Sequence, residues 1–293
     1  MKNNKKLLAL SMALALTLTA AACGGKTEPA SSSEATAPES SQAESSEAAS
    51  GETVTLKVGA SPAPHAEILE SIKPVLEQEG IQLEIVEFTD YVLPNKALDA
   101  GDIDANYFQH LPYLENFNQE NGTDLVSAAA IHFEPLGVYP GKAASVDALA
   151  DGASIAVPND PTNEARALLL LQKLGVIKLK DGANLESTPL DIVENPKNIK
   201  FEEMEAAQLP NVLPDVDLAV INGNYAVSAG IADKVLTTED KESEAAKEFA
   251  NIIAVRAGDD TRPEIQKLVE ALQSEDVAKF INEKYNGTVI PVF

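Results

Sequence analysis

The sequence has one cysteine, no tryptophan, three histidines and 22 basic residues against 46 acidic ones. A single cysteine excludes an internal disulfide framework and any zinc site built from several thiolates. The formal net charge of −24 repels phosphate backbones, so we expect no nucleic-acid partner. The 293 residues are enough for one large or two small domains with hydrophobic cores.

The apolar run near the N-terminus, Leu7–Leu18, is too short for a comfortable membrane span. It has about a dozen residues, whereas a transmembrane helix needs roughly 20. Three lysines precede it and the small residues Ala20–Ala22 follow it. This pattern is typical of a secretory signal, so we predict a signal peptide over residues 1–22.

Cys23 follows directly after those small residues. This arrangement resembles the lipobox of bacterial lipoproteins, in which the peptide is cut before the cysteine and its sulfur receives a diacylglycerol. The alternative is a plain signal peptide with a chance cysteine after it. Because two or more acyl chains anchor a protein stably, we expect a lipid anchor (diacylglycerol with a further acyl chain such as palmitate) on the outer face of a bacterial cell membrane.

The segment Gly24–Thr53 contains eight Ser, six Ala and six Glu, and no Val, Ile, Leu or aromatic residue. Such a segment cannot bury enough apolar surface to offset its loss of chain entropy. We therefore predict that residues 23–53 form a disordered tether that starts at the lipidated cysteine.

Strand-like and helix-like patterns alternate from Val54 to Phe293, which predicts an α/β fold with mostly parallel strands. The predicted strands are Val54–Ala60, Ile81–Phe88, Ile103–Asn106, Ala153–Val157, Leu218–Ile221 and Asn251–Val255. The rhythm resembles two-lobed periplasmic binding proteins of type II topology. That resemblance implies a first lobe of 54–145 plus 250–293, a second lobe of 146–249, and a ligand cleft between them lined by strand-end loops.

Arg166 lies in the segment Val157–Gly175, where Asp160 followed by Pro161 predicts the start of a helix. The chain has only three arginines, and this one stands about a turn and a half inside that helix. Its planar fork could bind a carboxylate through two hydrogen bonds. The alternative is an ion pair with Glu164 or another acid of this acidic protein.

Tyr107, Phe108, His110 and Tyr113 place four rings within seven residues, next to a predicted strand. Rings at the end of a strand can form the wall of an apolar slot with a polar rim. The alternative is burial in the core, above all for Tyr113. Tyr91 follows another predicted strand and could add a further wall.

Asn222 follows one further predicted strand, and Asn251 begins another. An amide carries donors and an acceptor, so it suits a ligand that has both an amine and a carboxylate. Each of them alone would more often be a turn residue.

The motifs together resemble the NlpA-type methionine-binding lipoproteins, the solute receptors of methionine ABC importers. The resemblance runs through "PHAEILE", "DYVLPNKAL", "GDIDANYFQHLPYL", "VPNDPTNEARALLLLQKLGVIKLKDG", "DIVENPKN", "AQLP" and "AVINGNYA". It implies that Arg166, Asn222 and Asn251 hold the carboxylate and ammonium of an amino acid. It also implies that Tyr91, Phe108 and His110 surround a thioether side chain.

The same resemblance implies a monomer without a cofactor that delivers L-methionine to a permease and an ATPase, and that catalyses no reaction. D-methionine or a methionine-containing dipeptide is an alternative ligand. A zinc or manganese receptor is a further alternative, because His65, His110 and His132 could converge with Glu134. The three histidines are scattered along the sequence, so we expect no metal site. An enzyme is not expected, because the sequence has no nucleophile-elbow glycine pattern.

Overall fold

The computed structural model describes residues 53–241 and 247–293. The predicted signal peptide, Cys23 and nearly all of the predicted tether lie outside these residues. Within them, none of the helices has the length and apolar character needed to cross a membrane.

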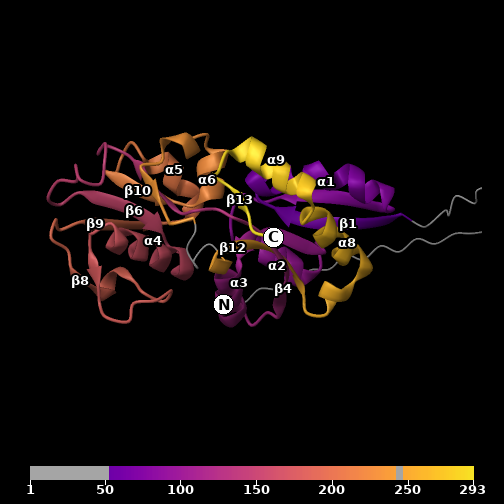
Figure 1. The fold of residues 1–293 in the computed structure, drawn as a ribbon. Coiled ribbons are helices and arrows are strands. Elements are labelled where there is room, and N and C mark those ends of the chain that lie inside the picture. The colour runs from indigo at the N-terminus through magenta and orange to yellow at the C-terminus, as the bar shows by residue number, and fades with distance from the viewer. Residues whose placement is uncertain (1–52, 242–246) are drawn as a thin grey trace, which may run out of the picture. The chain divides into compact units, whose positions relative to one another are not determined.

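A six-stranded sheet forms the first lobe, with the strand order β13-β4-β12-β3-β1-β2 (Figure 1). Its strands are β1 (Val54–Ala60), β2 (Ile81–Glu87), β3 (Ala105–His110), β4 (Leu125–Phe133), β12 (Ala250–Arg256) and β13 (Ile290–Pro291). Strand β1 is parallel to β2 and β3, whereas β12 is antiparallel to both of its neighbours. The C-terminal part of the chain therefore completes the sheet that the N-terminal part begins.

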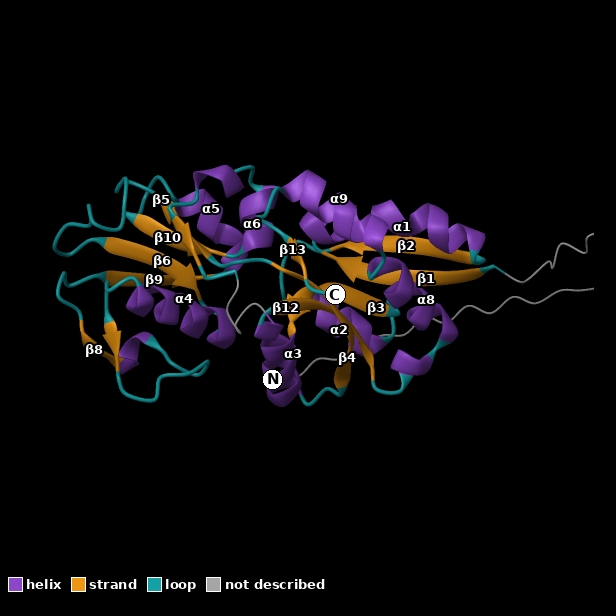
Figure 2. Cartoon of the chain, viewed as in Figure 1, coloured by secondary structure: helices purple, strands orange, loops and turns teal. Residues whose placement is uncertain are grey.

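Helices cover both faces of this sheet (Figure 2). They are α1 (Glu67–Gln78), α2 (Leu93–Ala100), α3 (Leu111–Asn121), α8 (Pro263–Leu272) and α9 (Glu275–Tyr285). Alternate residues of β12 belong to two cores: Ile253 and Val255 pack with α1, α8 and α9, and Ile252 and Ala254 pack with α2 and α3. This follows from the two-residue period of a strand.

A five-stranded sheet forms the second lobe, with the order β11-β5-β10-β6-β9. Its strands are β5 (Gly137–Pro140), β6 (Ser154–Pro158), β9 (Lys200–Met204), β10 (Leu218–Ile221) and β11 (Thr237–Thr238). Helix α4 (Pro161–Lys173) packs on one face, and α5 (Leu209–Val212) and α6 (Gly223–Ser228) pack on the other. A small hairpin adds β7 (Lys178–Leu179) and β8 (Ile192–Glu194). Short helical turns complete the described chain: η1 (Pro62–Ala66), η2 (Pro189–Asp191), η3 (Ala206–Gln208), η4 (Ala232–Lys234) and η5 (Asp259–Thr261).

Both sheets share one topology. In each sheet three parallel strands lie in the order second, first, third, counted along the chain among these three, and an antiparallel strand lies next to the third. The order is β2-β1-β3-β12 in the first lobe and β9-β6-β10-β5 in the second. The predicted α/β, two-lobed fold of type II topology is confirmed. By strand pairing the chain enters the second lobe between Phe133 and Gly137, earlier than the expected boundary at residue 145. We did not predict β5, because four residues ending in proline carry almost no strand signal.

Candidate functional site

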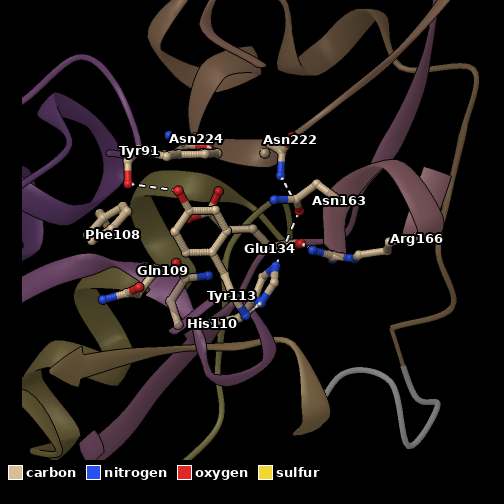
Figure 3. A pocket seen from close by; sticks show the side chains of 12 residues that line it. Tyr91, Phe108, Gln109, His110, Tyr113, Glu134, Asn163, Arg166, Asn222 and Asn224 are labelled. Carbon is tan, nitrogen blue, oxygen red and sulfur yellow. Dashed lines mark hydrogen bonds between the residues drawn. The ribbon is translucent and has the colours of Figure 1, made fainter. Parts of the chain in front are cut away.

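A cavity lies between the two lobes (Figure 3). All six predicted binding residues line it: Tyr91, Phe108, His110, Arg166, Asn222 and Asn251. Six further residues that we had not assigned to ligand binding complete the lining: Gln109, Tyr113, Glu134, Asn163, Gly223 and Asn224. Half of the lining residues are thus ones that the family resemblance implied, and residues far apart in the chain meet there.

Three rings of the first lobe form one side of the cavity. The ring centroids of Tyr91 and Phe108 lie 5.8 Å apart, and that of Tyr113 lies 5.8 Å from Tyr91 and 6.0 Å from Phe108. The hydroxyl of Tyr113 donates to the carbonyl oxygen of Tyr91 at 2.9 Å, which holds two of the rings together. Tyr113, for which we left core and wall open, lies in both: it is 8% exposed and lines the cavity.

Tyr107, Phe108 and His110 stand on strand β3 rather than on a loop after it, because the strand extends to His110, and Tyr113 lies in α3. The alternating side chains of β3 divide the cluster. Phe108 and His110 line the cavity, whereas Tyr107 packs in the core against the opposite face and hydrogen-bonds with His132. For Tyr107, the alternative of burial in the core is therefore the one that the structure shows.

His110 caps the N-terminus of α3 and connects the lobes. Its Nδ1 accepts a hydrogen bond from the backbone amide of Tyr113 at 3.2 Å. The proton therefore resides on Nε2, which donates to Oδ1 of Asn163 at 3.2 Å. Burial lowers the pKa of His110 to about 3, so the ring is neutral at pH 7.

Arg166 projects from α4, whose N-terminus is capped by Asp160 as predicted. The guanidinium is 4% exposed and lies 4.3 Å from the ring centroid of Phe249. Its Nε and Nη2 donate to the carboxylate of Glu239 at 2.7 and 2.5 Å, and Nη2 also donates to the carbonyl oxygen of Glu134 at 3.0 Å.

The ion pair changes the role that we predicted for this arginine. Glu239 occupies the edge of the guanidinium that we expected to clamp a ligand carboxylate through two bonds. Arg166 therefore forms an ion pair with an acid, which was the alternative that we considered. Its partner is Glu239, directly after β11, rather than Glu164. Nη1 makes none of these bonds.

Two amides of the second lobe leave polar atoms without a partner. Nδ2 of Asn222 donates to Asn163 at 2.9 Å, and Oδ1 of Asn224 accepts from the hydroxyl of Tyr91 at 2.6 Å. Among the described residues, no group bonds the remaining atoms, the acceptor Oδ1 of Asn222 and the donor Nδ2 of Asn224. Buried polar atoms are rarely left unpaired, so this wall suits a ligand with both a donor and an acceptor.

Glu134 brings a buried carboxylate to the same cavity. It is 5% exposed, and its Oε1 lies 2.7 Å from Nε2 of His132 and 3.4 Å from Nε2 of His65. Burial raises the pKa of Glu134, while nearby His65 and Arg166 oppose the increase. The Glu134 side chain can lie against the backbone of residue 223 because this residue is glycine: a Cβ there would lie only 2.7 Å from the Glu134 side chain.

Within residues 53–241 and 247–293, one group of side chains could hold a metal ion: His65, His132 and Glu134. Their potential ligand atoms lie within 4.8 Å of one another, so two of the scattered histidines do converge. His110, which the metal alternative also included, is not in this group. Both histidines already make hydrogen bonds to protein groups, and burial lowers the pKa of His65 to about 4 and that of His132 to about 3.

Asn163, Asn224 and Gln109 had no sequence signal strong enough to assign them. Asn163 lies in the first turn of α4, three residues after the capping residue Asp160, where a polar side chain is ordinary. Asn224 follows a glycine, which is typical of a turn. Gln109 lines the cavity, and its amide bonds Asn95 and Asn106 behind the wall.

Known proteins resemble this chain over its whole described part. The model of the NlpA lipoprotein family matches residues 56–293. The D-methionine-binding lipoprotein MetQ of Escherichia coli is 45% identical over 240 residues, covering 80% of this chain and 87% of that protein. A crystal structure from Ruminococcus gnavus has 54% identity and a TM-score of 0.80, covering 82% of this chain and 99% of that one. A nutrient-binding protein of Burkholderia cenocepacia, solved bound to methionine, has 48% identity and a TM-score of 0.77, covering 81% of this chain and 100% of that one. The chain therefore belongs to the NlpA lipoprotein family, as its motifs predicted.

Proposed function

We propose that this protein is a receptor that captures methionine between its lobes and delivers it to an ABC importer. The observation that carries the proposal is the division of one cavity into a polar side and a ring side. An arginine, an unpaired donor and an unpaired acceptor stand opposite three aromatic rings. Methionine has the matching division, because a zwitterionic head is joined to an apolar thioether tail. Relatives named for methionine binding support this choice.

The polar side is suited to the charged head. Oδ1 of Asn222 and the carboxylate of Glu134 are acceptors, which suits the ammonium. Nη1 of Arg166 and Nδ2 of Asn224 are donors, which suits the carboxylate. The predicted roles of Arg166, Asn222 and Asn251 in holding the head are retained in this proposal, with Glu134 and Asn224 added.

The ring side is suited to the tail. Sulfur near a ring edge gains about 0.3–1.5 kcal/mol per contact. Tyr91, Phe108 and Tyr113 lie close enough together to surround one thioether. His110 is neutral and closes the slot next to the polar side.

We propose that the protein is located on the outer face of the cell membrane. The receptor would be held by a lipid on Cys23 and would reach the permease and its ATPase through the tether of residues 23–53. We propose that it acts as a monomer, because the described residues of one chain supply both sides of the cavity. The role proposed is binding and transfer, with no chemical change of the ligand.

Isothermal titration calorimetry of the purified protein tests the proposal. The ligands are L-methionine, D-methionine, glycyl-L-methionine and zinc chloride, after unfolding and refolding to remove any bound ligand. We expect L-methionine to bind with the highest affinity and one molecule per chain. Tighter binding of D-methionine or of the dipeptide would change the ligand, and binding of zinc alone would replace the proposal by the metal receptor that His65, His132 and Glu134 allow.

A further inference from the structure

A chain of buried hydrogen bonds lies behind the cavity in the first lobe. It begins at Tyr107, which is fully buried and whose pKa burial raises well above its ordinary value, so the hydroxyl keeps its proton. Nδ1 of His132 is the partner of that hydroxyl. A hydroxyl proton directed at Nδ1 makes this nitrogen the acceptor, so the neutral ring carries its own proton on Nε2. That proton is donated to Oε1 of Glu134 at 2.7 Å.

The state of His65 follows from the same carboxylate. Its Nε2 lies 3.4 Å from Oε1 of Glu134, which already acts as an acceptor, and 2.9 Å from Oδ1 of Asn251. A nitrogen that faces two oxygen acceptors must carry the proton. Nδ1 of His65 is then the unprotonated nitrogen, and it is buried without a partner among the described residues. An unpaired acceptor there is compatible with this tautomer, whereas an unpaired N–H would lose a hydrogen bond of its own.

The tautomer of His65 in turn orients Asn251. The amide must direct its oxygen at His65, so its Nδ2 is the group left for the cavity that Asn251 lines. Strand β12 has a bulge at this point, with a register shift between Asn251 and Ile252 against β4. Bulges redirect side chains next to binding sites.

We propose that His65 is a positioning residue that fixes Asn251 as a hydrogen-bond donor to the carboxylate of the ligand. His65 itself is fully buried and does not line the cavity. Its effect passes through the amide of Asn251, which it directs toward the carboxylate of the head. This inference rests on the proposed binding of an amino acid.

The test compares two ligands that share ammonium and tail, L-methionine and L-methioninol, which has a hydroxyl in place of the carboxylate. In His65→Leu the amide of Asn251 loses its fixed orientation. We expect the Kd of L-methionine to rise at least 30-fold and that of L-methioninol to rise less than threefold. In His65→Gln, whose amide nitrogen can still donate to Asn251, we expect the ratio of the two Kd values to stay within threefold of the parent.

Two further variants separate positioning from stability. Asn251→Asp keeps the bond from His65 but presents an oxygen to the ligand, so L-methionine binding should fall more than 100-fold while L-methioninol binding is retained. Leu268→Ala, in the core of the same lobe, should lower the melting temperature and leave the Kd ratio unchanged.

The outcomes are distinguishable from failure of the proposed function. If the parent protein binds neither ligand, the proposed function is wrong. If the parent binds L-methionine but Asn251→Asp leaves the Kd ratio at the parent's value, the positioning role is wrong. The same holds if His65→Leu folds and weakens both ligands equally.

Discussion

The two lobes share a strand order but supply different chemistry to the cavity. The first lobe contributes the rings of Tyr91, Phe108 and Tyr113, whereas the second contributes the cation of Arg166 and the amides of Asn163, Asn222 and Asn224. A common topology therefore sets where strand ends meet, and the residues at those ends decide what each side recognises. We expect the second lobe, together with Asn251 of β12, to control affinity for the head of the ligand, and the rings of the first lobe to control selection of its tail.

The largest effect should come from the cation of the second lobe. Arg166→Ala is a poor test, because it removes the cationic partner of Glu239, whose carboxylate would then keep the bond from the backbone amide of Leu136 alone, so that lost stability and lost binding would be mixed. Arg166→Lys keeps a positive charge near Glu239 and removes the planar fork. We expect titration calorimetry to give an affinity for methionine that is weaker by about 10- to 100-fold, because a hydrogen bond to a charged group is worth about 1.5–3 kcal/mol. An affinity equal to that of the parent would remove the arginine from the site.

Phe108→Leu should change selection of the tail with a smaller loss of affinity. Leucine retains an apolar side chain but removes the ring that sulfur contacts, so methionine should bind roughly three- to tenfold more weakly. L-norleucine, which has a methylene in place of sulfur, should lose less. Competition binding of the two ligands measures the ratio, and an unchanged ratio would contradict the assignment of the tail to the first lobe.

Tyr91→Phe tests the contact between the lobes. It keeps the ring and removes the hydroxyl that donates to Oδ1 of Asn224 across the cavity. One neutral hydrogen bond is worth about 1 kcal/mol, so dissociation measured by stopped-flow fluorescence with a competing ligand should be about fivefold faster. Methionine and norleucine should be affected equally. A loss specific to methionine would mean that the hydroxyl recognises the tail.

Glu164→Gln should give the smallest effect, and only on stability. Burial, with the nearby carboxylates of Glu203 and Asp160, raises the pKa of Glu164 from 4.5 to about 7. The native state therefore holds a proton that the unfolded state has lost between these values, so this group lowers the stability of the fold as the pH rises from about 4.5 to about 7, and the loss persists at higher pH. Denaturant titration should find Glu164→Gln more stable by about 1 kcal/mol at pH 8 and by less at pH 5. The opposite trend would contradict the raised pKa.

The sequence predicted the residues whose position follows from a local rule. Asp160 and Pro161 start a helix as expected, and Asn222 follows a strand as expected. These two positions at the ends of β6 and β10 could therefore be predicted from local sequence. Residues that depend on distant contacts could not be predicted. The partner of Arg166 is Glu239, 73 residues away in a different segment, and no periodic pattern signals such a pair.

The histidines are a second case in which contacts between distant residues could not be predicted from the sequence. Spacing along the chain suggested that they do not meet, yet the ring centroids of His65 and His132 lie 4.9 Å apart. One follows β1 and the other ends β4, strands that belong to one sheet but are separated in sequence by three helices. The predicted strand Ile103–Asn106 ends too early, because β3 runs from Ala105 to His110. Its polar and aromatic residues are buried because helices cover both faces of the sheet, which local sequence does not reveal.

A crystal structure of the protein with bound L-selenomethionine tests the division of labour between the lobes most directly. Anomalous scattering locates the selenium without reference to the rest of the ligand. We expect the selenium among the rings of Tyr91, Phe108 and Tyr113, and the ligand carboxylate next to Arg166. Selenium beside the guanidinium, with the charged head among the rings, would contradict the account.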